Sequence, residues 1–120
     1  MEIELTDRQC RTIQRFIYRT LHNKGIEAEV TVTPGSVIVV PLLEWSQESQ
    51  RGEDGVIGAC ISVARVAVSR ALNVHTVGHS EITPDGYPHE YAHIVGVPYS
   101  SFSIEVCVSP VGIGECRCDY

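Results

Sequence analysis

VIGACISVARVAVSRAL, residues 56–72, is the stretch of sequence that decides the fold. Its many valine and isoleucine residues favour a β-strand. The small and polar residues favour a helix instead, because they recur at helical spacing, at Gly58, Ser62, Arg65, Ser69 and Asn73. Steps of three and four residues place all of them on one narrow face, and nearly every other position is apolar. We therefore predict a mostly buried helix with a stripe of small residues.

A second helix is predicted upstream, from Asp7 to Lys24. Thr6 is the expected N-cap, and Gln9 follows three residues later, which is the spacing of a capping box. Gly25 can adopt the left-handed conformation that ends a helix. We therefore expect a helix with defined ends on the N-terminal side of the chain.

The remaining regular structure is expected to be strands, because apolar residues alternate with polar ones or form short buried runs. The five predicted strands span residues 26–33, 37–43, 74–82, 87–97 and 101–109. The order helix, two strands, helix, three strands predicts an α+β fold of two layers, with both helices covering an antiparallel sheet of about five strands. The chain is expected to form a single domain, residues 1–120, with a polar loop or arm at 46–55 and a loop-like tail at 110–120.

Composition narrows the class of protein. The chain has 120 residues, of which 43% are hydrophobic and 20% charged, as in an ordinary globular domain. No apolar run approaches the ~18 residues of a membrane span, and the first ten residues, MEIELTDRQC, do not resemble a secretory signal. We therefore expect a cytoplasmic or virion protein that is neither secreted by a signal peptide nor bound to a membrane. The net charge of −6 argues against broad, charge-driven binding of nucleic acid.

The cysteines do not have the pattern of a disulfide framework. Their number is odd and their spacing uneven, at Cys10, Cys60, Cys107, Cys116 and Cys118. Such a set in a chain of the reducing cytoplasm is expected to remain as free thiols.

A metal-site motif lies in the last third of the chain. His89, Glu90 and His93 form the pattern HExxH, and Gly96 extends it to HExxHxxG. The motif resembles that of zincin metalloproteases, and this resemblance implies His89 and His93 as zinc ligands and Glu90 as the catalytic base. Tyr99 stands where related proteases have a third ligand.

The residues around HExxH favour a strand over the helix that such a protease needs. Pro88 directly precedes the motif, so no helical turn can lead into it. In a strand, His89 and His93 share one face and Glu90 lies on the other, where it cannot serve a metal that they bind. We therefore predict no cofactor and no catalytic residue, with a zinc-dependent protease as the alternative.

Two further site interpretations stay open. Cys116 and Cys118 could hold zinc together with His79, His89 or His93, as an alternative to a loop-like tail with free thiols. A catalytic cysteine paired with a histidine is also open, but no local sequence marks a nucleophile. The segment Gly55–Gly58 resembles the glycine loop of type II KH domains, which bind nucleic acid. The loop lacks the basic residues that such binding needs, because the next base is Arg65.

Candidate interface residues are the arginines of the first helix together with Trp45 and Arg51. The arginines recur at steps of three and four on the helix face opposite the apolar one, at Arg8, Arg11, Arg15 and Arg19. They could dock on an acidic partner or line a channel for DNA, or they could form a solvated face paired with carboxylates such as Glu2 and Glu4. Trp45 is either an interface anchor or a lid on the core.

One resemblance covers more of the chain. Residues 37–41, VIVVP, followed by the polar stretch that ends in Ser49-Gln50-Arg51-Gly52, are similar to the segment after the first helix in bacteriophage tail-terminator and neck proteins. That resemblance implies a small α+β subunit of a ring, joined through sheet edges and extended loops. The predicted helix at 56–72 departs from this family, which usually has a strand there. The same order of elements occurs in roadblock and profilin-like domains, which form dimers.

Taken together, the residues favour a non-catalytic assembly subunit that forms a homo-oligomer, most concretely a component of a phage tail or neck ring. The expected partners are further copies of the chain and other virion or assembly proteins, with DNA in a channel as an additional possibility. The alternatives are a small zinc metalloprotease and a module that binds a ligand or another protein.

Overall fold

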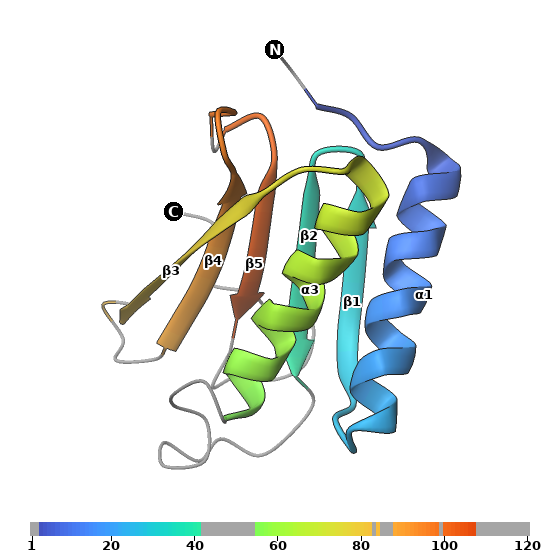
Figure 1. Cartoon of the computed structure of the whole chain (residues 1–120). Helices are drawn as coiled ribbons and strands as arrows, with labels where there is room; N and C mark the ends of the chain where they lie inside the picture. Colours follow the sequence, from blue (N-terminus) through green and yellow to red (C-terminus); the bar gives the residue numbers. More distant parts are fainter. Residues whose placement is uncertain (1–2, 42–54, 83, 85–87, 99, 108–120) are drawn as a thin grey trace.

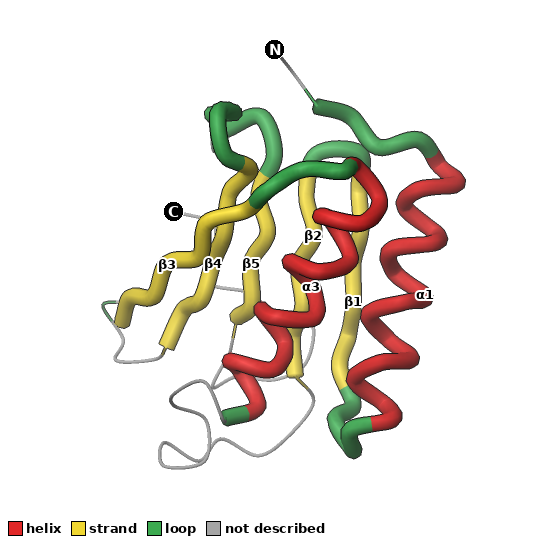
Figure 2. Tube along the Cα trace, in the orientation of Figure 1, coloured by secondary structure: helices red, strands yellow, loops and turns green. Residues whose placement is uncertain are grey.

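The computed structural model describes residues 3–41, 55–82, 84, 88–98 and 100–107. Within them the elements are α1 (Asp7–Asn23), β1 (Ala28–Thr33), β2 (Ser36–Pro41), α3 (Val56–Leu72), β3 (Thr76–Ile82), β4 (Pro88–Ile94) and β5 (Ser103–Cys107). Both helices lie on the same side of the sheet, with α1 beside β1 and α3 across the middle (Figures 1 and 2). The predicted order of elements and the two-layer α+β fold are confirmed. The expected arm up to residue 54, the tail at 110–120, Trp45 and Arg51 lie outside the described residues.

The sheet is mixed, so the prediction of an antiparallel sheet is wrong. Its order is β1-β2-β5-β4-β3, and β5 pairs in parallel with β2, whereas the other neighbours are antiparallel. The last four residues of β5 are all buried, which suits a central strand and not the edge position of a simple meander. Strand β5 lies between β2 and β4, and it runs in the same direction as β2 and opposite to β4.

The ends of α1 follow from local chemistry. The backbone N–H of Gln9 donates to the Thr6 hydroxyl, and the Gln9 side chain accepts from the Thr6 backbone N–H, so the predicted capping box is present. The helix ends at Asn23, one residue earlier than predicted, and Gly25 takes the left-handed conformation with φ of 81°. This capped helix presents Ile13, Ile17 and Leu21 to the sheet.

The helix predicted from the small-residue stripe is α3, and its bounds, Val56–Leu72, are those expected. Its buried residues include Ile57, Cys60, Ala64 and Val68, whereas Ser62 of the stripe is exposed. The high content of β-branched residues does not prevent a helix here, because burial of α3 against α1 and the sheet outweighs the low helix propensity of these residues.

The core lies between the helices and the sheet. Its largest fully buried side chain is Phe102, which is 1% exposed. The same buried cluster contains Ile13, Ile17 and Leu21 of α1 and Val37, Val39, Ile104 and Val106 of the central strands. Alternation along each strand sends the other set of side chains to the opposite side of the sheet. We call that side, on which the described residues place no helix, the open face (Figure 1).

Candidate functional site

The HExxH motif is part of β4, as the sequence predicts, and is therefore extended. Ala92 and Ile94 are buried against the helices, so Glu90, with the same parity, lies on the helix side of the sheet, and its carboxylate accepts a hydrogen bond of 2.5 Å from the Ser80 hydroxyl. His89 and His93 lie on the open face. The three side chains therefore do not converge on one point, and the described residues contain no group of three or more His, Cys, Asp or Glu side chains placed to hold a metal ion.

His93 instead meets His79 of β3 on the open face. Nε2 of His79 and Nδ1 of His93 are 3.0 Å apart, and the two ring planes differ by 11°. His79 also stacks on Tyr91, with ring centroids 5.0 Å apart. One nitrogen must donate and the other accept, so this contact requires a neutral ring at one of the two histidines at least. The pair can share a proton, but no described nucleophile adjoins it.

His89 is buried on the open face between two carboxylates. It is 3% exposed, its Nδ1 lies 3.1 Å from Oε1 of Glu81, and its Nε2 lies 3.7 Å from Oε1 of Glu105. Burial by itself lowers the pKa of His89, but the nearby carboxylate of Glu105 and the hydrogen-bonded carboxylate of Glu81 outweigh burial and raise the pKa above 6.5. The arrangement favours an imidazolium that is neutralised on both sides, which is a structural ion cluster and not a general base.

Two of the three described cysteines, Cys60 and Cys107, do not supply a catalytic thiolate, whereas Cys10 is a partly exposed free thiol. Cys60 is buried in α3, and this burial raises the pKa of its thiol to about 12. Cys107 is disulfide-bonded, so the expectation that all the thiols are reduced is wrong at this position. Cys116 and Cys118, the other candidate metal ligands, lie outside the described residues.

The candidate interface arginines occupy the outer face of α1. Arg8, Arg11, Arg15 and Arg19 are all exposed, on the side of the helix opposite Ile13 and Ile17. Within the described residues no ion pair joins these arginines to a carboxylate, Glu4 included, whereas histidines form the ion pairs that are present. The described residues therefore do not show the solvated, paired face that is one interpretation of this pattern.

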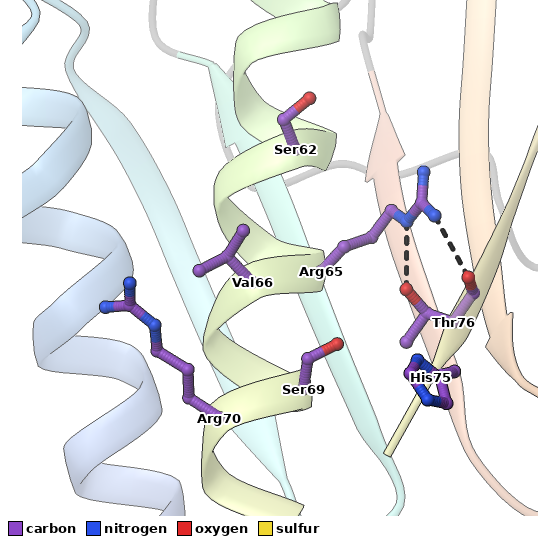
Figure 3. Close-up of a pocket in the computed structure, with 7 residues that line it drawn as sticks. All are labelled: Ser62, Arg65, Val66, Ser69, Arg70, His75 and Thr76. Atoms are coloured by element: carbon purple, nitrogen blue, oxygen red, sulfur yellow. Dashed lines mark hydrogen bonds between the residues drawn. The ribbon is translucent and has the colours of Figure 1, made fainter. Parts of the chain in front are cut away.

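A hollow of about 500 Å³ opens on the helical side, beside α3 and the start of β3 (Figure 3). Its polar side chains include Arg65, Arg70 and His75, a set that would suit an anion. The two guanidinium groups point in opposite directions, however, with Arg70 toward α1 and Arg65 toward β3 (Figure 3). Arg65 is already engaged, because its Nε donates to the Thr76 hydroxyl and its Nη2 donates to the Thr76 carbonyl, each at a distance of 3.0 Å. The hollow therefore does not focus two cations on one small ligand.

Reasoning from sequence missed the neighbours of the histidines. Alternation in β5 places the Glu105 side chain on the face of the sheet opposite to that of Ile104 and Val106. This pattern predicts the face of Glu105 but not the residue that it contacts. That Glu105 lies beside His89, and His79 beside His93, depends on strand order and register, which no local pattern supplies.

Comparison of the chain with protein-family models, with curated proteins and with solved structures found no match in any of the three. A search of the described helices found none with the length and apolar character needed to cross a bilayer.

Proposed function

We propose that the chain is a non-catalytic assembly subunit that associates with further copies of itself through β3. The supporting observation is a difference between the two edges of the sheet. Strand β1 forms one edge and β3 the other. An exposed strand edge offers unpaired N–H and C=O groups to another chain unless the protein covers it.

The β1 edge is covered by α1, which lies alongside it (Figure 1). The side-chain amide of Gln14 donates a hydrogen bond of 2.9 Å to the carbonyl oxygen of Val30 in β1. This bond occupies one acceptor that an incoming strand would need, as Arg65 does at Thr76 in β3, but among the described elements only β1 also has a helix packed along it, so addition of a strand at β1 is the less favoured.

The β3 edge is open in the part of the chain that the structure describes. The N–H of Val95 donates to the carbonyl of His75 across the β3–β4 ladder, and in an antiparallel ladder such inward groups alternate with outward ones. The backbone groups of Thr76, Gly78 and Ser80 therefore point away from β4. Arg65 occupies the Thr76 carbonyl and lies against Gly78, whereas no described group bonds the outward backbone groups of Gly78 and Ser80.

The side chains of β3 do not protect this edge. The strand, TVGHSEI, contains neither proline nor lysine, the residues that commonly prevent edge pairing. Val77 is 40% exposed on the open face, next to the edge. Pairing of β3 with β3 of a second copy would extend the sheet across a two-fold axis and cover this valine.

The more specific setting that we propose is a phage tail-terminator or neck ring, with other virion proteins as further partners. Its support is the resemblance of the segments VIVVP and SQRG to that family, together with the α+β architecture. A β3-to-β3 contact closes on itself, so a ring also needs a second contact. The surface that we assign to it is the exposed part of the open face, which includes Glu29 and Thr31 of β1 but not the buried His89 and Glu105.

Replacement of Val77 by lysine tests the β3 edge. A charge at this position must be buried or displaced when the edge pairs, so we expect self-association to weaken roughly tenfold or more, equivalent to about 1.4 kcal/mol. Sedimentation velocity over a range of protein concentrations measures the change, and circular dichroism verifies the fold.

The matched control is Val95→Lys. Val95 is 55% exposed and follows β4 without belonging to a strand, so the same substitution there should leave association within twofold of the original. Equal association of Val77→Lys and the unaltered protein would contradict the assignment of β3. A protein that remains monomeric at high concentration would contradict the proposed function itself.

A further inference from the structure

We infer that the helical layer binds the phosphate backbone of nucleic acid, a contact separate from the self-association at β3. The observation behind this inference is the distribution of charge. Every lysine and arginine among the described residues lies in α1, directly after it at Lys24, or in α3; they are Arg8, Arg11, Arg15, Arg19, Lys24, Arg65 and Arg70.

Acidic residues are nearly absent from the same layer. Asp7, in the first turn of α1, is the one acidic residue of the two helices. The other described acidic residues precede α1 or belong to the sheet and its connections, at Glu4, Glu27, Glu29, Glu81, Glu90 and Glu105. Among the described residues, the bases therefore gather on the helical layer, although the net charge of the chain is −6.

The positive charges are accessible and unpaired. Arg8, Arg11, Arg15, Arg19, Lys24 and Arg70 are exposed, and none forms an ion pair with another described residue. Arg11, Arg15 and Arg19 follow one another at steps of four, and like charges at this spacing destabilise a helix by a few tenths of a kcal/mol per pair. Helix stability thus does not explain the pattern, whereas a polyanionic partner does.

The dimensions of the charged surface suit a nucleic-acid backbone. Arg8 and Arg19 are eleven residues apart, which is about 16 Å along the helix axis, and a duplex carries one negative charge per ~1.7 Å. Arg70 extends the surface from α3 toward α1 (Figure 3). Its guanidinium carbon lies 5.7 Å from the centre of the Phe16 ring. Arg65 is not part of this surface, because Thr76 holds its guanidinium.

A polyphosphate fits this surface better than the sheet of a second copy does. Among the described residues of the open face, Glu29 is exposed, the Glu81 side chain is 43% exposed and Glu105 is buried, so the described part of that face offers few carboxylates to so many bases. The planar guanidinium fork of arginine matches a phosphate. Two described carboxylates adjoin this surface, because Glu27 accepts a hydrogen bond from Tyr18 of α1 and Glu29 lines a hollow together with Arg11 and Arg15, but the exposed bases outnumber them.

Fluorescence anisotropy with a labelled mixed-sequence duplex of about 20 base pairs tests the inference. We expect micromolar binding at about 50 mM salt that weakens steeply as salt is added. The variant R8Q/R11Q/R15Q/R19Q should bind at least tenfold more weakly at that salt concentration. The plot of log K against log salt concentration should also become less steep for this variant. Each lost phosphate contact reduces the slope by about 0.9, so four lost contacts reduce it by up to about 3.6.

The matched control, R8K/R11K/R15K/R19K, keeps the charge and should bind within a few-fold of the original. Both variants should fold and self-associate like the original, since β3 is unaltered. Three results would overturn the inference: no binding of the duplex at about 50 mM salt, equal binding by the glutamine variant, or equally tight binding of labelled polyglutamate, which would indicate an acidic protein as the partner.

Discussion

Replacement of Phe102 by alanine is expected to lower the free energy of unfolding by about 3–5 kcal/mol. Phe102 is 1% exposed, and it directly precedes β5, the strand that joins the two halves of the sheet. Truncation removes a large buried ring and leaves a cavity under the helices. Because small domains are stable by only about 5–15 kcal/mol, the loss is a large fraction of the total. Urea denaturation followed by circular dichroism measures it.

The control for this substitution is Val95→Ala. Val95 is 55% exposed, so its truncation should change the free energy of unfolding by no more than about 0.5 kcal/mol. A loss below about 1 kcal/mol for Phe102→Ala would show that the core between the helices and the central strands is not packed around this ring.

The variant Glu105→Gln should be destabilised by about 3 kcal/mol at pH 5, near the lower limit for breaking a buried ion pair. The lower limit applies because Glu81 still contacts His89, at 3.1 Å. The pKa of His89 is raised in the folded state, so the stabilisation from its protonated ring is fully present below the unfolded value of about 6.5 and is lost as pH rises through the folded value. The difference between the two proteins should therefore shrink toward alkaline pH.

Denaturation curves recorded at several pH values between about 5 and 9 measure this difference. Glu29→Gln is the matched control, because Glu29 belongs to β1 and is exposed. It should cause a small change without this pH dependence. A difference between Glu105→Gln and the original protein that is constant over the whole range would show that His89 is not the titrating partner.

The helices and the strand at HExxH could be predicted because their signals are local. Thr6 and Gln9 specify a helix start, and the steps from Gly58 to Ser69 distinguish a helix from a strand in a valine-rich segment. Pro88 excludes a helical turn before His89, so the backbone of the motif follows from sequence.

Strand order and the histidine contacts could not be predicted, because alternation assigns a residue to a face and not to a neighbour. Nothing within SFSIEVCVS shows that β5 enters between β2 and β4. The proximity of His89 to Glu105, and of His79 to His93, follows from that placement and from register. Net charge likewise does not predict where charges lie, since −6 is a sum over a chain whose described bases all belong to one layer.

Hydrogen exchange at the amides of Gly78 and Ser80, followed at low and at high protein concentration, tests the account's central claim most directly. Both amides point away from β4 and should exchange rapidly in the free subunit. If β3 pairs with another copy, their exchange should slow as concentration rises, while exposed amides elsewhere stay unchanged. Rapid exchange at both positions in a sample that sediments as an oligomer would contradict assembly through this edge.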